Sequence, residues 1–238
     1  MSVELSLPTP ATRAFTRLAS DLRRVLGERF VALVAYSARE SMVFAETILA
    51  DDLDALSALA GAWHSDGLAI PLLLTPQEFQ RSLDVFPLEY QAILERHVVI
   101  AGRPPFGGAA VGHEDLRRAC EAQARGHLIH LRQGWLQAGA HDEHLAEMIE
   151  RSATPFQTLL AHVARLEDGS ESASPRRPDP DELAGFAERA IGMPAELARG
   201  IFELDEHPER SHQLVTRLAD YLAATERLWQ LADAWRTR

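Results

Sequence analysis

Hydrophobic residues change their spacing about halfway along this chain of 238 residues. In the first half, Ala11–Leu26 carries apolar residues at helical spacing, whereas Phe30–Ser37 and Met42–Leu49 have the length and the β-branched and aromatic content of strands. In the second half, spacing of three and four residues prevails without a strand pattern. The pattern predicts an α+β fold, with a small mixed β-sheet domain followed by an all-α helical bundle.

Turn and capping signals delimit the rest of the first half. A helix, a strand, a helix and a strand are expected, in this order: Leu53–His64, Leu68–Leu74, Leu88–Glu95 and Val98–Ile100. Thr75-Pro76-Gln77-Glu78 is a capping box with proline at the first helical position, so a short helix begins there. An acidic cluster, Asp51, Asp52 and Asp54, is expected to cap a helix rather than to bind a metal.

The second half is expected to contain these helices: Glu114–Gln137, Asp142–Leu166, Asp181–Ile191, Pro194–Leu204 and Ser211–Trp235. Pro155 is expected to kink or interrupt the second of them, because proline removes a helical hydrogen bond. The polar segment 167–180 is rich in serine and proline and is predicted to be a flexible loop. We place the two domains at residues 1–110 and 111–238.

The composition limits the class of protein and the cellular compartment that we expect for this chain. Hydrophobic residues make up 46% of the chain and charged residues 25%, which excludes a disordered chain. No apolar run approaches the roughly 20 residues that span a bilayer, and the first residues lack the pattern of a signal peptide. Cys120 is the only cysteine, so no intramolecular disulfide can form. We therefore expect a cytoplasmic protein that does not enter a membrane.

The charged residues exclude several chemistries. All 24 basic residues are arginine, so a Schiff-base lysine and a phosphate-loop lysine are both impossible. The net charge of −11 disfavours nucleic acid as a partner, because non-specific nucleic-acid binding relies on a basic surface. A local group of arginines can still hold one anionic ligand.

The order of elements resembles the nucleotidyltransferase superfamily, which includes the aminoglycoside-modifying and minimal nucleotidyltransferases. The resemblance covers Phe30–Gly102 as the catalytic domain and Glu114–Trp235 as the helical domain. Active members of this superfamily have a Gly-Ser signature after the first strand, an Asp-x-Asp pair on the second and another acid on a later strand. In this chain Tyr36-Ser37 stands at the signature, and the glycine is absent.

The acids that the resemblance requires are also missing. The second strand offers only Glu46, and Leu68–Leu74 contains no carboxylate. Nucleotidyl transfer needs Mg²⁺ ions held by several carboxylate oxygens, and a single acid cannot form a two-metal site. Glu40 lies six positions before Glu46, roughly 20 Å away along a straight strand, which is too far to share a metal. We expect an inactive relative with no metal or cofactor; an active enzyme with displaced acids is the alternative.

Two groups of residues are candidates for ligand binding. The first lies around the two strands and consists of Tyr36, Ser37, Arg39 and Glu46. The second recurs every seven residues along one helix and consists of Arg118, Arg125 and Arg132. These arginines either pair with Glu114 and Glu121, each four residues before an arginine, or form an anion-binding row that faces a cleft between the domains.

Histidines on the same helix give a third hypothesis. Arg125 and His130 match an Arg-x-x-x-x-His pattern that resembles the ribonuclease motif of the HEPN families. Five helical residues rotate a side chain by about 500°, which leaves the two side chains roughly 140° apart and favours a coincidental match. The pairs His127/His130 and His141/His144, the second with Glu147 nearby, have metal-compatible spacing but lack further ligands, so we expect surface or core residues.

Together these patterns favour a non-catalytic nucleotidyltransferase-like protein. Its expected partners are a small anionic ligand such as a nucleotide, another protein or a second copy of the chain as a homodimer. A working nucleotidyltransferase and a HEPN-type ribonuclease are the alternatives.

Overall fold

The computed structural model describes residues 6–167 and 179–237 of the chain. The chain divides into two compact units, Met1–Gly112 and His113–Arg238. The expected α+β fold is confirmed, since the first unit contains a four-stranded mixed sheet and the described part of the second contains only helices. The flexible loop predicted at 167–180 lies almost wholly outside the described residues.

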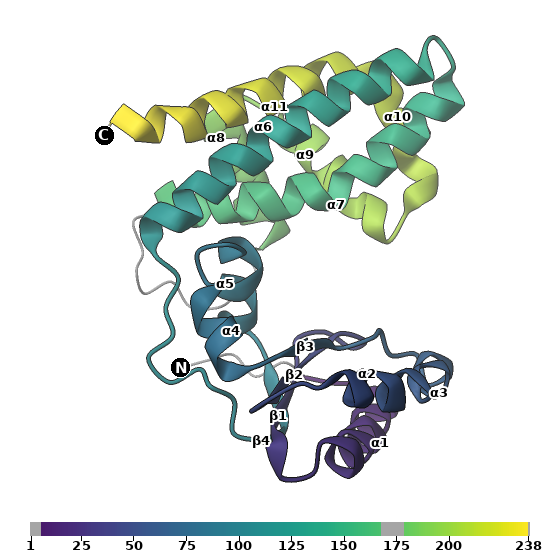
Figure 1. Ribbon diagram of the computed structural model, residues 1–238. Coiled ribbons are helices and arrows are strands. Elements are labelled where there is room, and N and C mark those ends of the chain that lie inside the picture. Colours follow the sequence, from purple (N-terminus) through teal and green to yellow (C-terminus); the bar gives the residue numbers. More distant parts are fainter. Residues whose placement is uncertain (1–5, 168–178, 238) are drawn as a thin grey trace. The chain divides into compact units, whose positions relative to one another are not determined.

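The first unit is built on its sheet (Figure 1). Its elements in chain order are α1 (Thr9–Leu26), β1 (Phe30–Ala35), β2 (Ser41–Ala45), α2 (Ala50–Ser57), α3 (Ala60–Ser65), β3 (Leu72–Leu74), α4 (Pro76–Arg81), α5 (Pro87–Glu95) and β4 (Val98–Gly102). The strand order is β3-β2-β1-β4. Strand β1 is antiparallel to β2 and to β4, whereas β2 and β3 are parallel.

Each face of the sheet is covered by helices, as expected when successive strand residues point to opposite sides. Leu33 and Val43 pack with α1, α2 and α3 on one face. Val34 and Phe44 pack with residues of α4 and α5 on the other (Figure 1). The central strands are therefore buried on both faces, which explains why they read as continuous apolar runs.

Three elements of this unit differ from the sequence-based expectation. The helix expected over Leu53–His64 is two helices, α2 and α3, separated by a turn. Strand β2 ends at Ala45, before the expected Leu49, although the N–H of Glu46 still donates to the Arg29 carbonyl at 2.8 Å. Strand β3 begins only at Leu72, since Pro71 has no N–H to donate to a strand partner.

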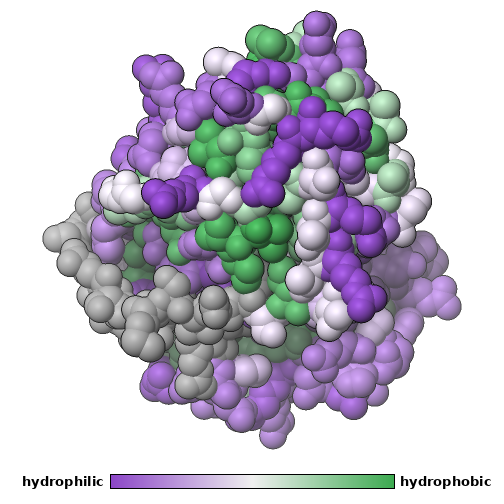
Figure 2. All heavy atoms as spheres, turned by 90° about the horizontal axis from the view of Figure 1, so that it is seen from below, coloured by the Kyte–Doolittle hydropathy of each residue, from purple (hydrophilic) through white to green (hydrophobic). Residues whose placement is uncertain are grey.

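Apolar side chains also reach the surface of the first unit. Ile70 is 62% exposed and Val85 is 61% exposed. Figure 2 shows apolar residues mixed with hydrophilic ones on the face that it draws. Such scattered exposure is normal for a folded protein and marks no site by itself.

The described elements of the second unit are α6 (His113–Ala138), α7 (Asp142–Glu167), α8 (Pro180–Ile191), α9 (Ala195–Phe202), α10 (Ser211–Leu214) and α11 (Leu218–Asp233), with short 3₁₀ turns after α9 and around α10. Helix α6 packs against both α7 and α11. The helix expected over Ser211–Trp235 is divided by the 3₁₀ turn Val215–Arg217. Helix α7 continues through Pro155 without interruption. No helix in the described ranges is both long enough and apolar enough to cross a membrane.

Candidate functional site

The polar side chains of the turn between β1 and β2 form hydrogen bonds within the first unit. The Ser37 hydroxyl oxygen accepts from the backbone N–H groups of Arg39 and Glu40, at 3.2 and 2.9 Å. The Arg39 side chain donates to the carbonyl of Gly67 at 3.1 Å. Partial burial, and then the charge of Glu40, raise the pKa of Tyr36. Three of the residues predicted to bind a ligand therefore close this turn and join it to a neighbouring loop.

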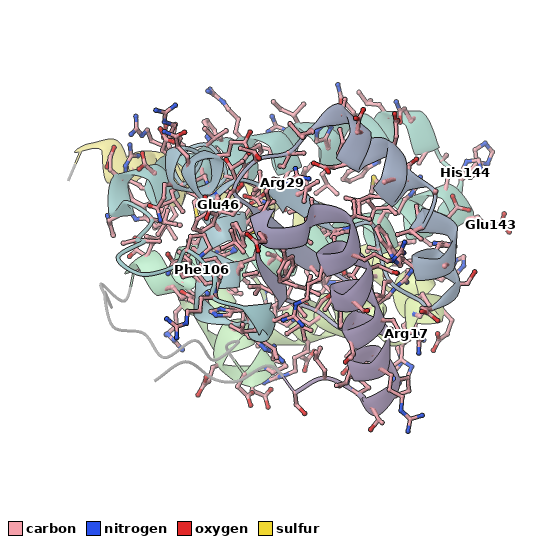
Figure 3. The ribbon with its side chains drawn as sticks, turned by 60° about the horizontal axis from the view of Figure 1, so that its bottom comes forward. Arg17, Arg29, Glu46, Phe106, Glu143 and His144 are labelled. Atoms are coloured by element: carbon pink, nitrogen blue, oxygen red, sulfur yellow. The ribbon has the colours of Figure 1, made fainter. Side chains whose placement is uncertain are left out.

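The fourth of these residues, Glu46, is exposed just beyond β2, next to Arg29 (Figure 3). The Arg29 guanidinium donates to both carboxylate oxygens of Asp52, at 2.5 and 2.7 Å. Asp52 also accepts the N–H of Leu49 at 2.8 Å, which confirms that it caps α2. The hydrogen bond from Arg29 is the main cause that lowers the pKa of Asp52 to about 2. Arg29 thus ties the segment after β2 to the start of α2.

The face of β2 that carries Met42 and Phe44 does not fit a magnesium site. Both side chains are fully buried. The ring of Phe44 makes edge contacts with Phe79 at 5.5 Å and with Phe106 at 5.7 Å. Mg²⁺ requires oxygen ligands, which this aromatic cluster does not supply. Among residues 6–167 and 179–237, no group of three or more His, Cys, Asp or Glu side chains is arranged to hold a metal ion.

The three arginines spaced by seven along α6 all have partners within the second unit. The partner is Asp115 for Arg118 at 2.8 Å, the Trp229 ring for Arg125 at 5.3 Å, and Glu226 for Arg132 at 3.3 Å. Glu114, expected to pair with Arg118, instead pairs with Arg117 at 2.7 Å. Ion pairing is therefore found for Arg118, with Asp115 in place of the predicted Glu114, and for Arg132, for which no partner was predicted.

Arg125 and His130 contact different parts of the bundle. Arg125 lies over Trp229 of α11. His130 lines a pocket whose opposite wall is α7. The two side chains of the ribonuclease-like pattern therefore point apart within this chain, as the helical rotation predicted.

The pocket between α6 and α7 has a volume of about 460 Å³, within the range of small-molecule sites. Helix α6 supplies three polar side chains, His127, His130 and Gln137, together with apolar residues such as Leu131. Helix α7 supplies His144, Glu147, Met148, Arg151, Ser152 and Pro155. The lining therefore combines an apolar body with a few polar groups, which is typical of ligand sites.

Charged side chains gather at the exposed part of this pocket, here called the mouth. Glu147 and Arg151 lie one turn apart on α7, with 64% and 76% of their side chains exposed. Their charged groups are 3.6 Å apart, so the pair is loose and accessible to a ligand. His144 stands near the start of α7 (Figure 3). Its ring lies 5.4 Å from that of His141. The mouth therefore offers a guanidinium and imidazoles to an ionic group.

Two half-buried polar residues, His127 and Ser152, form the other side of the pocket with the buried Tyr221 behind them, and this side is here called the floor. Nε2 of His127 lies 3.1 Å from the Tyr221 hydroxyl, and this hydroxyl lies 3.1 Å from Oγ of Ser152. Burial, with a smaller effect of His130, lowers the pKa of His127 to about 4. Burial raises the pKa of Tyr221. Both groups are therefore neutral near pH 7, and they link α6, α7 and α11 through hydrogen bonds.

Gly134 permits close contact between the two walls of the pocket. A Cβ atom at this position would lie 2.7 Å from Sδ of Met148 and 2.8 Å from its Cγ. These separations are shorter than real carbon contacts, so any side chain here would displace Met148. The absence of a side chain on Gly134 therefore helps to set the width of the pocket.

Comparison of the chain with protein-family models, with curated proteins and with solved structures found no match. The evidence for a site therefore rests on geometry. The sequence pattern drew attention to His127 and His144 only as metal candidates, and to His130 also as part of the ribonuclease-like pattern. It missed Tyr221, which lies 94 residues after His127, and it missed Arg151. No local sequence signal links these positions, because they meet only when α6, α7 and α11 pack together.

Proposed function

We propose that this chain is a nucleotidyltransferase-like protein that does not transfer nucleotides and instead binds a small anionic ligand. The order of helices and strands in the first unit and its mixed sheet support the relationship. The burial of Met42 and Phe44 on the strand that carries the acids in active relatives supports the loss of catalysis.

The observation that carries the binding function is the α6–α7 pocket with Arg151 at its mouth. A guanidinium binds carboxylate or phosphate through paired hydrogen bonds, and the adjacent imidazoles of His130 and His144 add further donors. The Nε of Arg151 donates to the Glu147 carbonyl at 3.2 Å, but its Nη2 is 3.6 Å from the Glu147 carboxylate, so an incoming anion can replace this carboxylate at little cost. Leu131 and Met148 offer apolar surface to the body of the ligand.

Calorimetry on the full chain with phenyl phosphate, AMP and benzoate tests this function. We expect at least one of the three to bind, and we expect Arg151→Gln to weaken that binding about tenfold or more, since it removes a charge-assisted contact. Arg118→Gln is the matched control, because Arg118 is an exposed arginine of the same unit that pairs with Asp115 outside the pocket. Equal losses in the two variants would contradict a role for Arg151.

The proposed absence of catalysis has its own test. The chain is incubated with labelled nucleoside triphosphates, Mg²⁺ and a range of hydroxyl acceptors, and no label is expected to be transferred. Transfer that is lost in Glu46→Gln would instead favour an active enzyme with displaced acids.

A further inference from the structure

The donor and the acceptor can be assigned for each hydrogen bond among Ser152, Tyr221 and His127 at the floor of the pocket. The Ser152 hydroxyl donates to the Ile149 carbonyl at 2.8 Å. A serine hydroxyl has a single proton, so Oγ of Ser152 acts as an acceptor toward Tyr221. The Tyr221 hydroxyl therefore directs its own proton to Ser152, whose Oγ lies at 3.1 Å and whose carbonyl lies at 3.4 Å. The phenolic oxygen is left to accept a hydrogen bond from His127.

This direction fixes the tautomer of His127. Its Nε2, 3.1 Å from the Tyr221 oxygen, must carry the proton to donate. With its pKa lowered to about 4, the ring is neutral near pH 7 and has only one N–H group. Nδ1 is therefore an acceptor, and within the described part of the chain it has no hydrogen-bond partner. Nδ1 is not sealed from solvent, and because His127 lines the pocket, a donor group in the pocket can reach it.

We propose that His127 determines the specificity of the α6–α7 pocket, because its Nδ1 accepts a hydrogen bond from a hydroxyl or amino group of the ligand. The ligand is then a small anion whose acidic group binds Arg151 at the mouth and whose donor group reaches His127 at the floor. This inference rests on the proposed anion binding and narrows the ligand class to hydroxylated or amino-substituted acids.

The tautomer is tested without any ligand. The protein is labelled with ¹⁵N-histidine, and the ring resonances of His127 are assigned by their loss in His127→Gln. Two-dimensional correlation of ring nitrogens with ring protons is expected to show a protonated Nε2 and an unprotonated Nδ1 at pH 7. In Tyr221→Phe, which keeps the ring and removes its acceptor, the two tautomers should mix. A protonated Nδ1 in the wild-type protein would overturn the inference.

Selectivity is tested on the wild-type chain with two probes of similar size, 4-hydroxybenzoate and 4-fluorobenzoate, of which only the first can donate. Calorimetry is expected to give about 2- to 10-fold tighter binding of the hydroxyl probe, the effect of one net hydrogen bond. In His127→Phe the difference should disappear. Equal affinities in the wild-type chain would overturn the inference and leave anion binding standing. Failure of both probes to bind would overturn this inference together with the proposed binding of small carboxylates.

Discussion

The guanidinium of Arg29 and the carboxylate of Asp52 form a two-bond ion pair, with N–O distances of 2.5 and 2.7 Å. The same arginine donates to the Thr47 carbonyl at 3.2 Å, and its own carbonyl accepts from Glu46. Arg29, the residue directly before β1, therefore makes hydrogen bonds both to the segment after β2 and to the start of α2. The segment that follows β2 thus has a structural role in the first unit.

The pH dependence of this ion pair is the first prediction. The pKa of Asp52 is lowered from 3.8 to about 2, so the pair stabilises the fold above about pH 4 and loses this effect as the pH falls toward 2. Asp52→Asn should therefore have a lower Tm than the wild-type protein at pH 7, and the two values should converge on acidification. Thermal melts followed by circular dichroism measure this. Asp51→Asn, an exposed neighbour, is the control, and a gap in Tm that persists at pH 2 would contradict the prediction.

A second prediction concerns the buried histidines of the bundle. Burial lowers the pKa values of both His127 and His162 from 6.5 to about 4. Between these values the unfolded chain binds more protons than the folded one, so stability falls as the pH falls through this window. At pH 5 the loss is about 2 kcal/mol for each histidine. Urea unfolding at pH 7 and pH 5 should show a smaller loss for His162→Leu than for the wild-type protein.

The exposed His212 offers the control for this comparison. His212→Leu should keep the full pH dependence of the wild-type protein. The same loss between pH 7 and pH 5 in all three proteins would mean that His162 is not held neutral by burial.

The aromatic cluster on β2 gives the third prediction. Phe44→Ala should destabilise the protein by about 3 to 5 kcal/mol, since it removes a fully buried ring that contacts Phe79 and Phe106. Phe44→Leu should cost clearly less, and Phe44→Asp should prevent folding, because a carboxylate would be buried among rings. Denaturant unfolding of the first two variants and soluble yield of the third are the measurements. A folded Phe44→Asp protein that binds Mg²⁺ would show that this face accepts a metal after all.

The fourth prediction tests the contact at Gly134. Gly134→Ala places a Cβ atom 2.7 Å from Sδ of Met148 and should destabilise the bundle by about 1 to 3 kcal/mol. Gly126→Ala, on the same helix, meets nothing within 4 Å and should instead stabilise it by up to about 1 kcal/mol. In a Met148→Ala background, Gly134→Ala should cost clearly less than in the wild-type chain, because the atoms that its Cβ would meet are gone. Urea unfolding of these variants measures the changes in stability. Equal changes for Gly134→Ala and Gly126→Ala would contradict the close contact between position 134 and Met148.

The spacing of apolar residues was sufficient to predict most helices and strands of the fold. The apolar runs around β1 and β2 and the three-and-four spacing of α6 predicted these elements because burial imposes those periods. The pattern failed at the ends of two strands: Pro71 delays the start of β3, and β2 ends at Ala45 although apolar residues continue beyond it. Pro155 did not interrupt α7, since packing against α6 maintains the helix on both sides of the missing N–H group.

The candidate site was much less predictable than the fold. Spacing alone placed Arg118, Arg125 and Arg132 in one row, yet each has a partner of its own in the bundle. The partners of Arg125 and Arg132 lie on α11, far along the chain, and the pocket likewise combines side chains of α6 and α7 above a tyrosine of α11. Contacts of this kind depend on how helices pack, which the sequence of one helix does not contain.

The bond between His127 and Tyr221 also has a consequence for the order of folding. Helices α6 and α7 are neighbours in sequence and can pair early, whereas Tyr221 comes 94 residues after His127 and closes a distant contact. A nascent chain that has not yet released α11 has both walls of the pocket but lacks the hydroxyl that orients the imidazole. The selectivity proposed for this pocket therefore depends on the packing of α11 against α6 and α7.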